Sequence, residues 1–141
     1  MGAVVGRLVA CVAVCCAACV IAAGAQAART TSDGIGTAAQ VTRGEAVYRR
    51  ACARCHLDDL VGVDRFPALV GDAFFDKWIG GTVATFVDRM RSMPADAPAS
   101  LPDADYVDLA VFVLNANGVP TGQGPLAADE ASHKNIVIQK R

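Results

Sequence analysis

The sequence predicts an all-α protein built from about four to five short helices. Several segments repeat apolar residues at the spacing of one helix face, and Thr, Asp, Gly and Pro stand where such helices would begin and end. The chain shows neither an internal repeat nor the strand–helix alternation of a parallel sheet. Its 141 residues suit one domain.

Residues 1–27 have the order of parts of a secretory signal peptide. Arg7 is followed by an uncharged apolar run over residues 8–24 and by an A-x-A cleavage signal that ends at Ala27. Two alternatives remain: the run approaches the ~18 residues that span a bilayer, so an uncleaved segment would be a membrane anchor, and Cys11 ends a lipobox-like tetrapeptide. Cleavage after Ala27 is favoured because the run is rich in Ala and poor in Leu, and too little apolar chain precedes Cys11.

Removal of this segment changes the charge and the cysteine content of the chain. Arg7 is the only one of the 13 basic and 14 acidic residues that it contains, so the remaining chain has a net charge of −2. That balance argues against a nucleic-acid partner, which requires a basic face. Four of the six cysteines also lie in the segment, so Cys52 and Cys55 are the thiols that remain.

The residues that follow predict a leader and a first helix. Residues 28–41 are mostly Thr, Ser, Gly and Ala, which indicates a flexible leader before a domain over residues 42–141. Thr42 and Glu45 have the spacing of a capping box. We therefore expect a helix with Thr42 as its N-cap that runs to about Cys52.

Three more helices are expected after a Gly- and Pro-containing loop at residues 57–71. Asp72 can cap a short helix that two glycines stop, and Thr82 can cap the next one. A proline-rich stretch then excludes helix. The last helix covers about residues 103–116, with acidic residues in its first turn and Asn-Gly after its end.

Residues 52–56 form the pattern C-x-x-C-H, which is typical of c-type haem attachment. At this spacing Cys52 and Cys55 reach the two vinyl-derived carbons of one porphyrin edge, and His56 then supplies an axial nitrogen to the iron. A thioredoxin-like pair would need a βαβ context, and a zinc site would need further ligands where only His133 remains. We therefore predict one covalent haem c.

Segments that flank this motif carry a resemblance to a known family. They are residues 44–48 (GEAVY), residues 66–71 (FPALVG), Met93-Pro94 and residues 106–118. In this order they resemble class I c-type cytochromes, and the chain is most similar to the small bacterial monohaem cytochromes that accompany periplasmic dehydrogenases, including pyrroloquinoline-quinone types. The resemblance implies the cytochrome c fold, a periplasmic location, and a close crossing of the first and last helices with Gly44 near Ala110.

The resemblance also implies which residues surround the iron. It places the second axial ligand at Met93, whereas Met90 lies on the apolar stripe of its helix and is better explained as core. Pro67 resembles the proline whose carbonyl accepts a hydrogen bond from the proximal histidine. Leu69 would then pack on the haem face.

Other side chains leave two interpretations. Trp78 would donate to a haem propionate or pack in the core. Arg54, Arg65 and Lys77 would either screen the charge of the haem propionates or be ordinary solvated surface residues. His133 lies in a polar tail, where Ile136 and Ile138 alternate as in a short extended segment, and a solvated surface histidine is expected.

A haem iron with His and Met ligands has no open position, which predicts an electron-transfer protein and not an enzyme. The expected donor is a periplasmic dehydrogenase, and the expected acceptor is a terminal oxidase or another cytochrome, each met in a small transient interface. Two alternatives remain. In the first, the chain is a tightly bound subunit of a dehydrogenase complex and docks through the tail after Pro120. In the second, it is an enzyme or a sensor with a five-coordinate haem.

Overall fold

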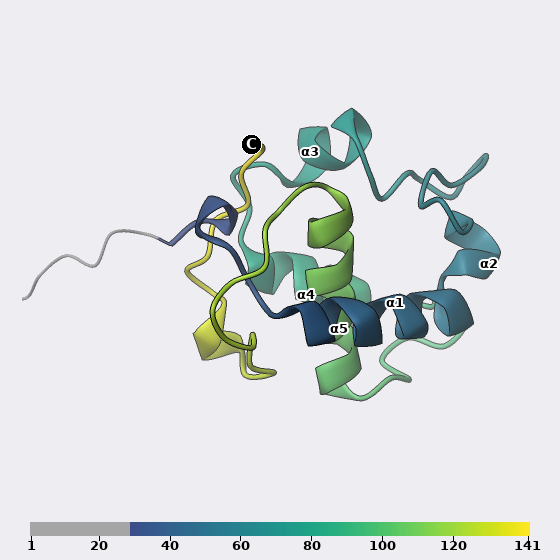
Figure 1. The fold of residues 1–141 in the computed structure, drawn as a ribbon. Helices are drawn as coiled ribbons and strands as arrows, with labels where there is room; N and C mark the ends of the chain where they lie inside the picture. Colours follow the sequence, from purple (N-terminus) through teal and green to yellow (C-terminus); the bar gives the residue numbers. More distant parts are fainter. Residues whose placement is uncertain (1–28) are drawn as a thin grey trace, which may run out of the picture.

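The computed structural model describes residues 29–141, so the predicted signal peptide lies outside the described residues. The described part is all-α, as expected, and Figure 1 shows its helices arranged around α5. They are α1 (Ala38–Ala51), α2 (Ala53–His56), α3 (Asp72–Trp78), α4 (Val83–Arg91) and α5 (Asp103–Ala116), with the short 3-10 helices η1 (Thr31–Asp33) and η2 (Glu130–Ser132). No helix among residues 29–141 has the length and apolar character needed to cross a bilayer.

Helices α1 and α5 cross at Gly44, as the resemblance to class I c-type cytochromes implied. A Cβ atom at Gly44 would lie 2.0 Å from the Asp108 carbonyl oxygen and 2.7 Å from Cβ of Phe112, so no larger residue fits without movement. Asp108 and Phe112 flank Ala110, the expected contact point. Eight residues of α5 are buried, which makes this helix the centre of the core.

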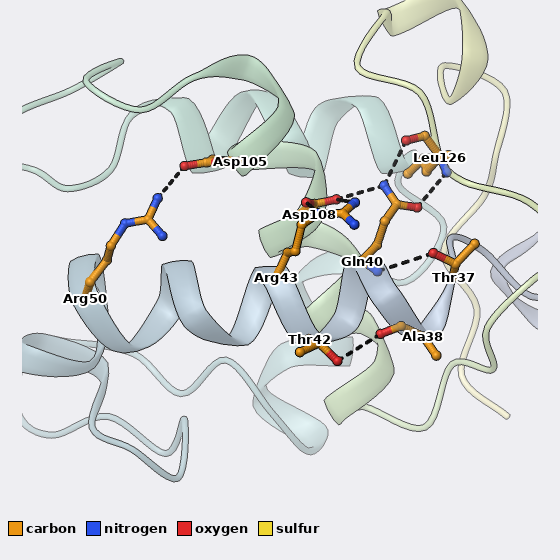
Figure 2. A network of polar contacts seen from close by, with 9 residues as sticks. All are labelled: Thr37, Ala38, Gln40, Thr42, Arg43, Arg50, Asp105, Asp108 and Leu126. Carbon is orange, nitrogen blue, oxygen red and sulfur yellow. Dashed lines mark hydrogen bonds and ion pairs between the residues drawn. The ribbon is translucent and has the colours of Figure 1, made fainter.

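A polar network beside this crossing joins α1 to α5 and to the C-terminal segment (Figure 2). The carboxylate of Asp108, which is 4% exposed, accepts hydrogen bonds from Arg43 Nε at 2.6 Å and from Gln40 Nε2 at 2.9 Å. The Gln40 amide also donates to the Leu126 carbonyl at 3.0 Å and accepts from the Leu126 N–H at 2.8 Å. A second ion pair, Arg50 with Asp105, lies about two turns further along α1. Both oxygens of the buried Asp108 carboxylate therefore accept hydrogen bonds.

The start of α1 differs from the prediction, because the helix begins at Ala38 with Thr37 as its N-cap. The Thr37 side chain accepts from the Gln40 N–H at 3.3 Å, while the Thr42 hydroxyl donates to the Ala38 carbonyl within the helix. The prediction that Thr42 is the N-cap is therefore wrong. The reason for the earlier start is a tertiary contact. When residue 40 is part of the helix, the Gln40 side chain reaches Asp108 of α5 and is buried there.

Part of the segment predicted as a flexible leader packs on the domain. The side chains of Thr31, Ile35 and Gln40 are buried, and the Thr31 N–H donates to the Val137 carbonyl at 2.9 Å. Figure 1 shows this N-terminal segment beside the yellow C-terminal tail. The packed part of the chain therefore begins before residue 42.

The C-terminal tail is extended where the sequence predicted it, but it is buried. Ile136 and Ile138 are 2% and 0% exposed, and Val137 forms bridges with Thr30 and Thr82. His133 is also 0% exposed, so its prediction as a surface histidine is wrong. The tail folds back over the start of α4 because its main chain pairs with residues 81 and 83, and this places His133 inside.

Replacement of Gly44 by Ala should destabilise the haem-loaded protein by about 1–3 kcal/mol, because the added methyl group overlaps the α5 backbone. Chemical denaturation followed by helical circular dichroism measures this free energy of unfolding. Gly124→Ala is the control, because a Cβ there meets no atom within 4 Å. Equal stabilities of the two variants would contradict the close crossing.

Candidate haem site

One cavity of about 610 Å³ lies between the helices, and most of its wall is apolar. This volume is in the range of cofactor pockets. All seven residues that the sequence assigned to the site line this cavity, namely Cys52, Cys55, His56, Pro67, Leu69, Trp78 and Met93. Residues that are far apart in the chain therefore meet in one place.

The two cysteines and the histidine are held in one tight turn after α1. The backbone N–H groups of Cys55 and His56 both donate to the Cys52 carbonyl, each at 3.0 Å. Both thiols are free and half-buried. Burial, with a contribution from the Cys55 thiol, raises the pKa of the Cys52 thiol to about 11, so this thiol is protonated at neutral pH before haem is attached. The turn thus presents two thiols and one imidazole to the same cavity.

His56 is buried, and its ring orientation is fixed by one hydrogen bond. Nδ1 lies 2.9 Å from the Pro67 carbonyl oxygen. A carbonyl can only accept, so Nδ1 carries the proton and Nε2 keeps its lone pair. This is the tautomer that a metal-binding histidine requires.

The loop after His56 folds back so that Pro67 reaches the imidazole. The Gly62 N–H donates to the His56 carbonyl at 3.0 Å, and the Leu69 N–H donates to the Leu60 carbonyl at 2.8 Å. Gly62 has a φ of +68°, and a Cβ there would lie 2.2 Å from the Phe66 carbonyl oxygen. Only glycine combines this left-handed conformation with so close an approach of the main chain.

Both candidate methionines line the cavity on the side contributed by α4. Met90 also packs against the hydrophobic core, as the sequence suggested. Met93 follows the end of α4, and its carbonyl accepts a hydrogen bond from the Tyr106 hydroxyl at 3.1 Å. Neither Tyr106 nor Asn117, which binds the loop around Leu69, was assigned to the site from sequence, because no local pattern marks such long-range contacts.

The rim of the cavity is basic. Four cationic side chains contribute to its lining, and they are Arg54, Arg65, Lys77 and Arg89. Arg54 forms an ion pair with Asp96, which lies in the loop after Met93, so the two sides of the cavity are joined there. Both partners are more than half exposed, and the pair therefore adds little stability.

Trp78 packs in the wall of the cavity instead of standing alone. Its ring meets that of Phe86 in an edge-to-face contact, with 4.8 Å between the centroids. The Lys77 ammonium group lies 5.6 Å from the indole centroid. These contacts support the core-packing interpretation of Trp78, and its hydrogen bond to a propionate stays a prediction.

The family model described as cytochrome c oxidase, cbb3-type, subunit III matches residues 39–113, which is more than half of the chain. The chain belongs to this family of c-type cytochromes. The cytochrome therefore binds haem c covalently. Cys52 and Cys55 fit the attachment, because they are the free thiols of the described chain and both line the cavity.

A solved structure, the sulfane dehydrogenase SoxCD from Paracoccus pantotrophus, is similar to this cytochrome at 27% sequence identity and a TM-score of 0.47. The match covers 65% of this chain and 52% of the SoxCD chain, so the cytochrome spans about half the length of that protein. No curated protein matches.

Replacement of both Cys52 and Cys55 by Ser should leave haem that acidified organic solvent extracts completely, because no thioether bond remains. A mass spectrum of the denatured wild-type protein should show the polypeptide plus one haem, and the double variant should show the bare polypeptide. Each single variant keeps one thiol and serves as the control. Covalent haem in the double variant would show that other residues attach it.

Proposed function

We propose that this cytochrome is an exported electron carrier of the bacterial periplasm, whose single haem iron is held between His56 and Met93. The observation that carries the proposal is the cavity itself. Its wall combines two free thiols, an imidazole with Nδ1 already bonded to Pro67, and a thioether side chain. An iron with these two axial ligands has no open position, so the protein exchanges single electrons and transforms no substrate.

Met93 is proposed as the second ligand because of its place at the end of α4. Met90 is part of the helix and belongs to the side chains packed on the core, whereas Met93 begins the irregular chain that borders the cavity. Its main chain is held by Tyr106, which leaves the side chain free to turn toward the iron. A thioether is a soft ligand that favours the reduced iron and raises the potential.

The residues that line the cavity set the polarity and charge around the haem iron. Bound haem c supplies an iron that takes up and releases one electron. The apolar wall, to which Leu69, Leu109 and Val113 contribute, keeps water from the iron and lowers the local dielectric constant. The basic rim compensates the propionate charges. The Pro67 carbonyl holds the proximal ring in place through its hydrogen bond with His56 Nδ1.

Weak, rapid encounters with partners suit this function. We propose a periplasmic dehydrogenase as donor and a terminal oxidase or another cytochrome as acceptor, and the oxidase subunit in the family description supports an acceptor of that kind. A tightly bound dehydrogenase subunit was expected to dock through its tail. In the structure Ile136 and Ile138 are buried in the domain, so these two side chains are not available to dock on a partner.

A reversible redox titration of the purified protein, with spectra of both states, tests the proposal. One electron per haem and a spectrum of a six-coordinate iron are expected. Carbon monoxide should bind the reduced protein slowly and incompletely at neutral pH. Rapid stoichiometric binding would contradict the proposal and favour the five-coordinate enzyme or sensor.

Met93→Ala should abolish the weak sulfur-to-iron absorption band of the oxidised protein at the red edge of the spectrum, and it should lower the reduction potential. Met90→Ala is the matched control, because it removes the other thioether of the cavity and should keep the band. If the band survives in Met93→Ala and disappears in Met90→Ala, Met90 is the ligand.

A further inference from the structure

Helix α5 contacts two loops near the proposed iron ligands, one near each of its ends: the loop that begins at Met93 and the loop whose Pro67 orients His56. Near the N-terminal end, the hydroxyl of Tyr106 donates to the Met93 carbonyl at 3.1 Å and accepts from the Leu101 N–H at 3.3 Å. Tyr106 is 1% exposed, so these bonds are shielded from water. The main chain on both sides of the proline-rich loop is thereby tied to α5.

The other end of α5 is tied to the loop that carries Pro67. The Asn117 amide donates to the Leu69 carbonyl at 2.8 Å and accepts from the Gly71 N–H at 3.0 Å. The same amide nitrogen donates to the Val113 carbonyl, also at 2.8 Å, which anchors the side chain on its own helix. Two main-chain groups of the loop, 48 and 46 residues away in sequence, therefore depend on one side chain.

The chemistry of these contacts requires an amide. Asparagine offers both a carbonyl acceptor and an NH₂ donor, whereas an ionised aspartate can only accept and alanine does neither. Asn115, two residues earlier, donates to the Val119 carbonyl and does not reach the loop. The loop contact thus distinguishes Asn117 from a neighbour of the same type.

We propose that Tyr106 and Asn117 are positioning residues through which α5 sets the placement of both iron ligands, an inference that rests on the proposed ligation by His56 and Met93. The two residues are separated by about 16 Å along the helix axis. Leu109 and Val113 line the cavity between them. Because α5 is the most buried helix, it acts as a rigid spacer between the two loops.

The two positions should affect the reduction potential in opposite directions. Loss of the Asn117 contacts loosens the Pro67 loop and weakens its hydrogen bond to His56 Nδ1. The imidazole then becomes a weaker donor, which disfavours the oxidised iron and raises the potential. Loss of the Tyr106 hydroxyl loosens Met93, weakens the thioether bond that favours reduced iron, and lowers the potential.

The experiment compares redox titrations of the haem-loaded variants Asn117→Ala, Asn117→Leu and Tyr106→Phe, with Asn115→Ala as the matched control. We expect both Asn117 variants to favour the reduced state by about threefold, a rise of about 28 mV for a one-electron couple. Tyr106→Phe should give a fall of similar size and a weaker sulfur-to-iron band. Asn117→Leu keeps the size, removes both the donor and the acceptor and adds no charge, so it provides the test if Asn117→Ala does not accumulate.

Different results reject this inference and the proposed function. If the wild-type protein lacks the sulfur-to-iron band, the proposed ligation fails. If the wild-type protein has the band but the Asn117 variants match Asn115→Ala, the positioning role of Asn117 is overturned. Shifts of Asn117→Leu and Tyr106→Phe in the same direction would also overturn it, because a general loss of packing would then explain both.

Discussion

The close approach of α1 to α5 at Gly44 is the constraint on which the rest of the structure depends. It brings the α1 backbone to the Asp108 carbonyl, and the Asp108 carboxylate is then within reach of Arg43 and Gln40. Gln40 in turn holds Leu126, so the crossing also fixes the start of the C-terminal segment. The haem-attachment turn directly follows α1, so the same crossing also fixes the position of Cys52 and Cys55 relative to α5.

The site divides its tasks between rigid helices and irregular chain. The helices supply most of the apolar wall, whereas the groups that would touch the iron stand at a helix end or in a loop. Loops of this kind have few contacts of their own and need outside partners to stay in place. His56 obtains its orientation from Pro67, and the Pro67 loop obtains its position from Leu60 and Asn117. The positions of His56 and Met93 therefore depend on the buried core through hydrogen bonds that side chains make to main-chain carbonyls.

This arrangement suits a protein that moves electrons. A change of one charge on the iron perturbs the ligands least when their supporting groups are already bonded and buried. The structure supplies this support on both sides of the cavity, with a carbonyl behind the imidazole and a tyrosine hydroxyl behind Met93. The buried tail adds to it indirectly, because it covers the start of α4 and keeps that helix against the core.

The resemblance to class I c-type cytochromes supplied Pro67, Leu69 and Met93, whereas the sequence pattern by itself determined the all-α class, the bounds of α5, the N-cap of α4 and the attachment motif of Cys52, Cys55 and His56. These features are local: covalent attachment needs two thiols and a histidine at fixed spacing, and caps and breakers act within a few residues. Only the tertiary structure placed the N-cap of α1 at Thr37 instead of Thr42 and the His133 side chain in the interior. It also decided which main-chain groups Tyr106 and Asn117 bind. Each of these outcomes depends on groups that are distant in the chain, and no pattern of neighbouring residues encodes such a contact.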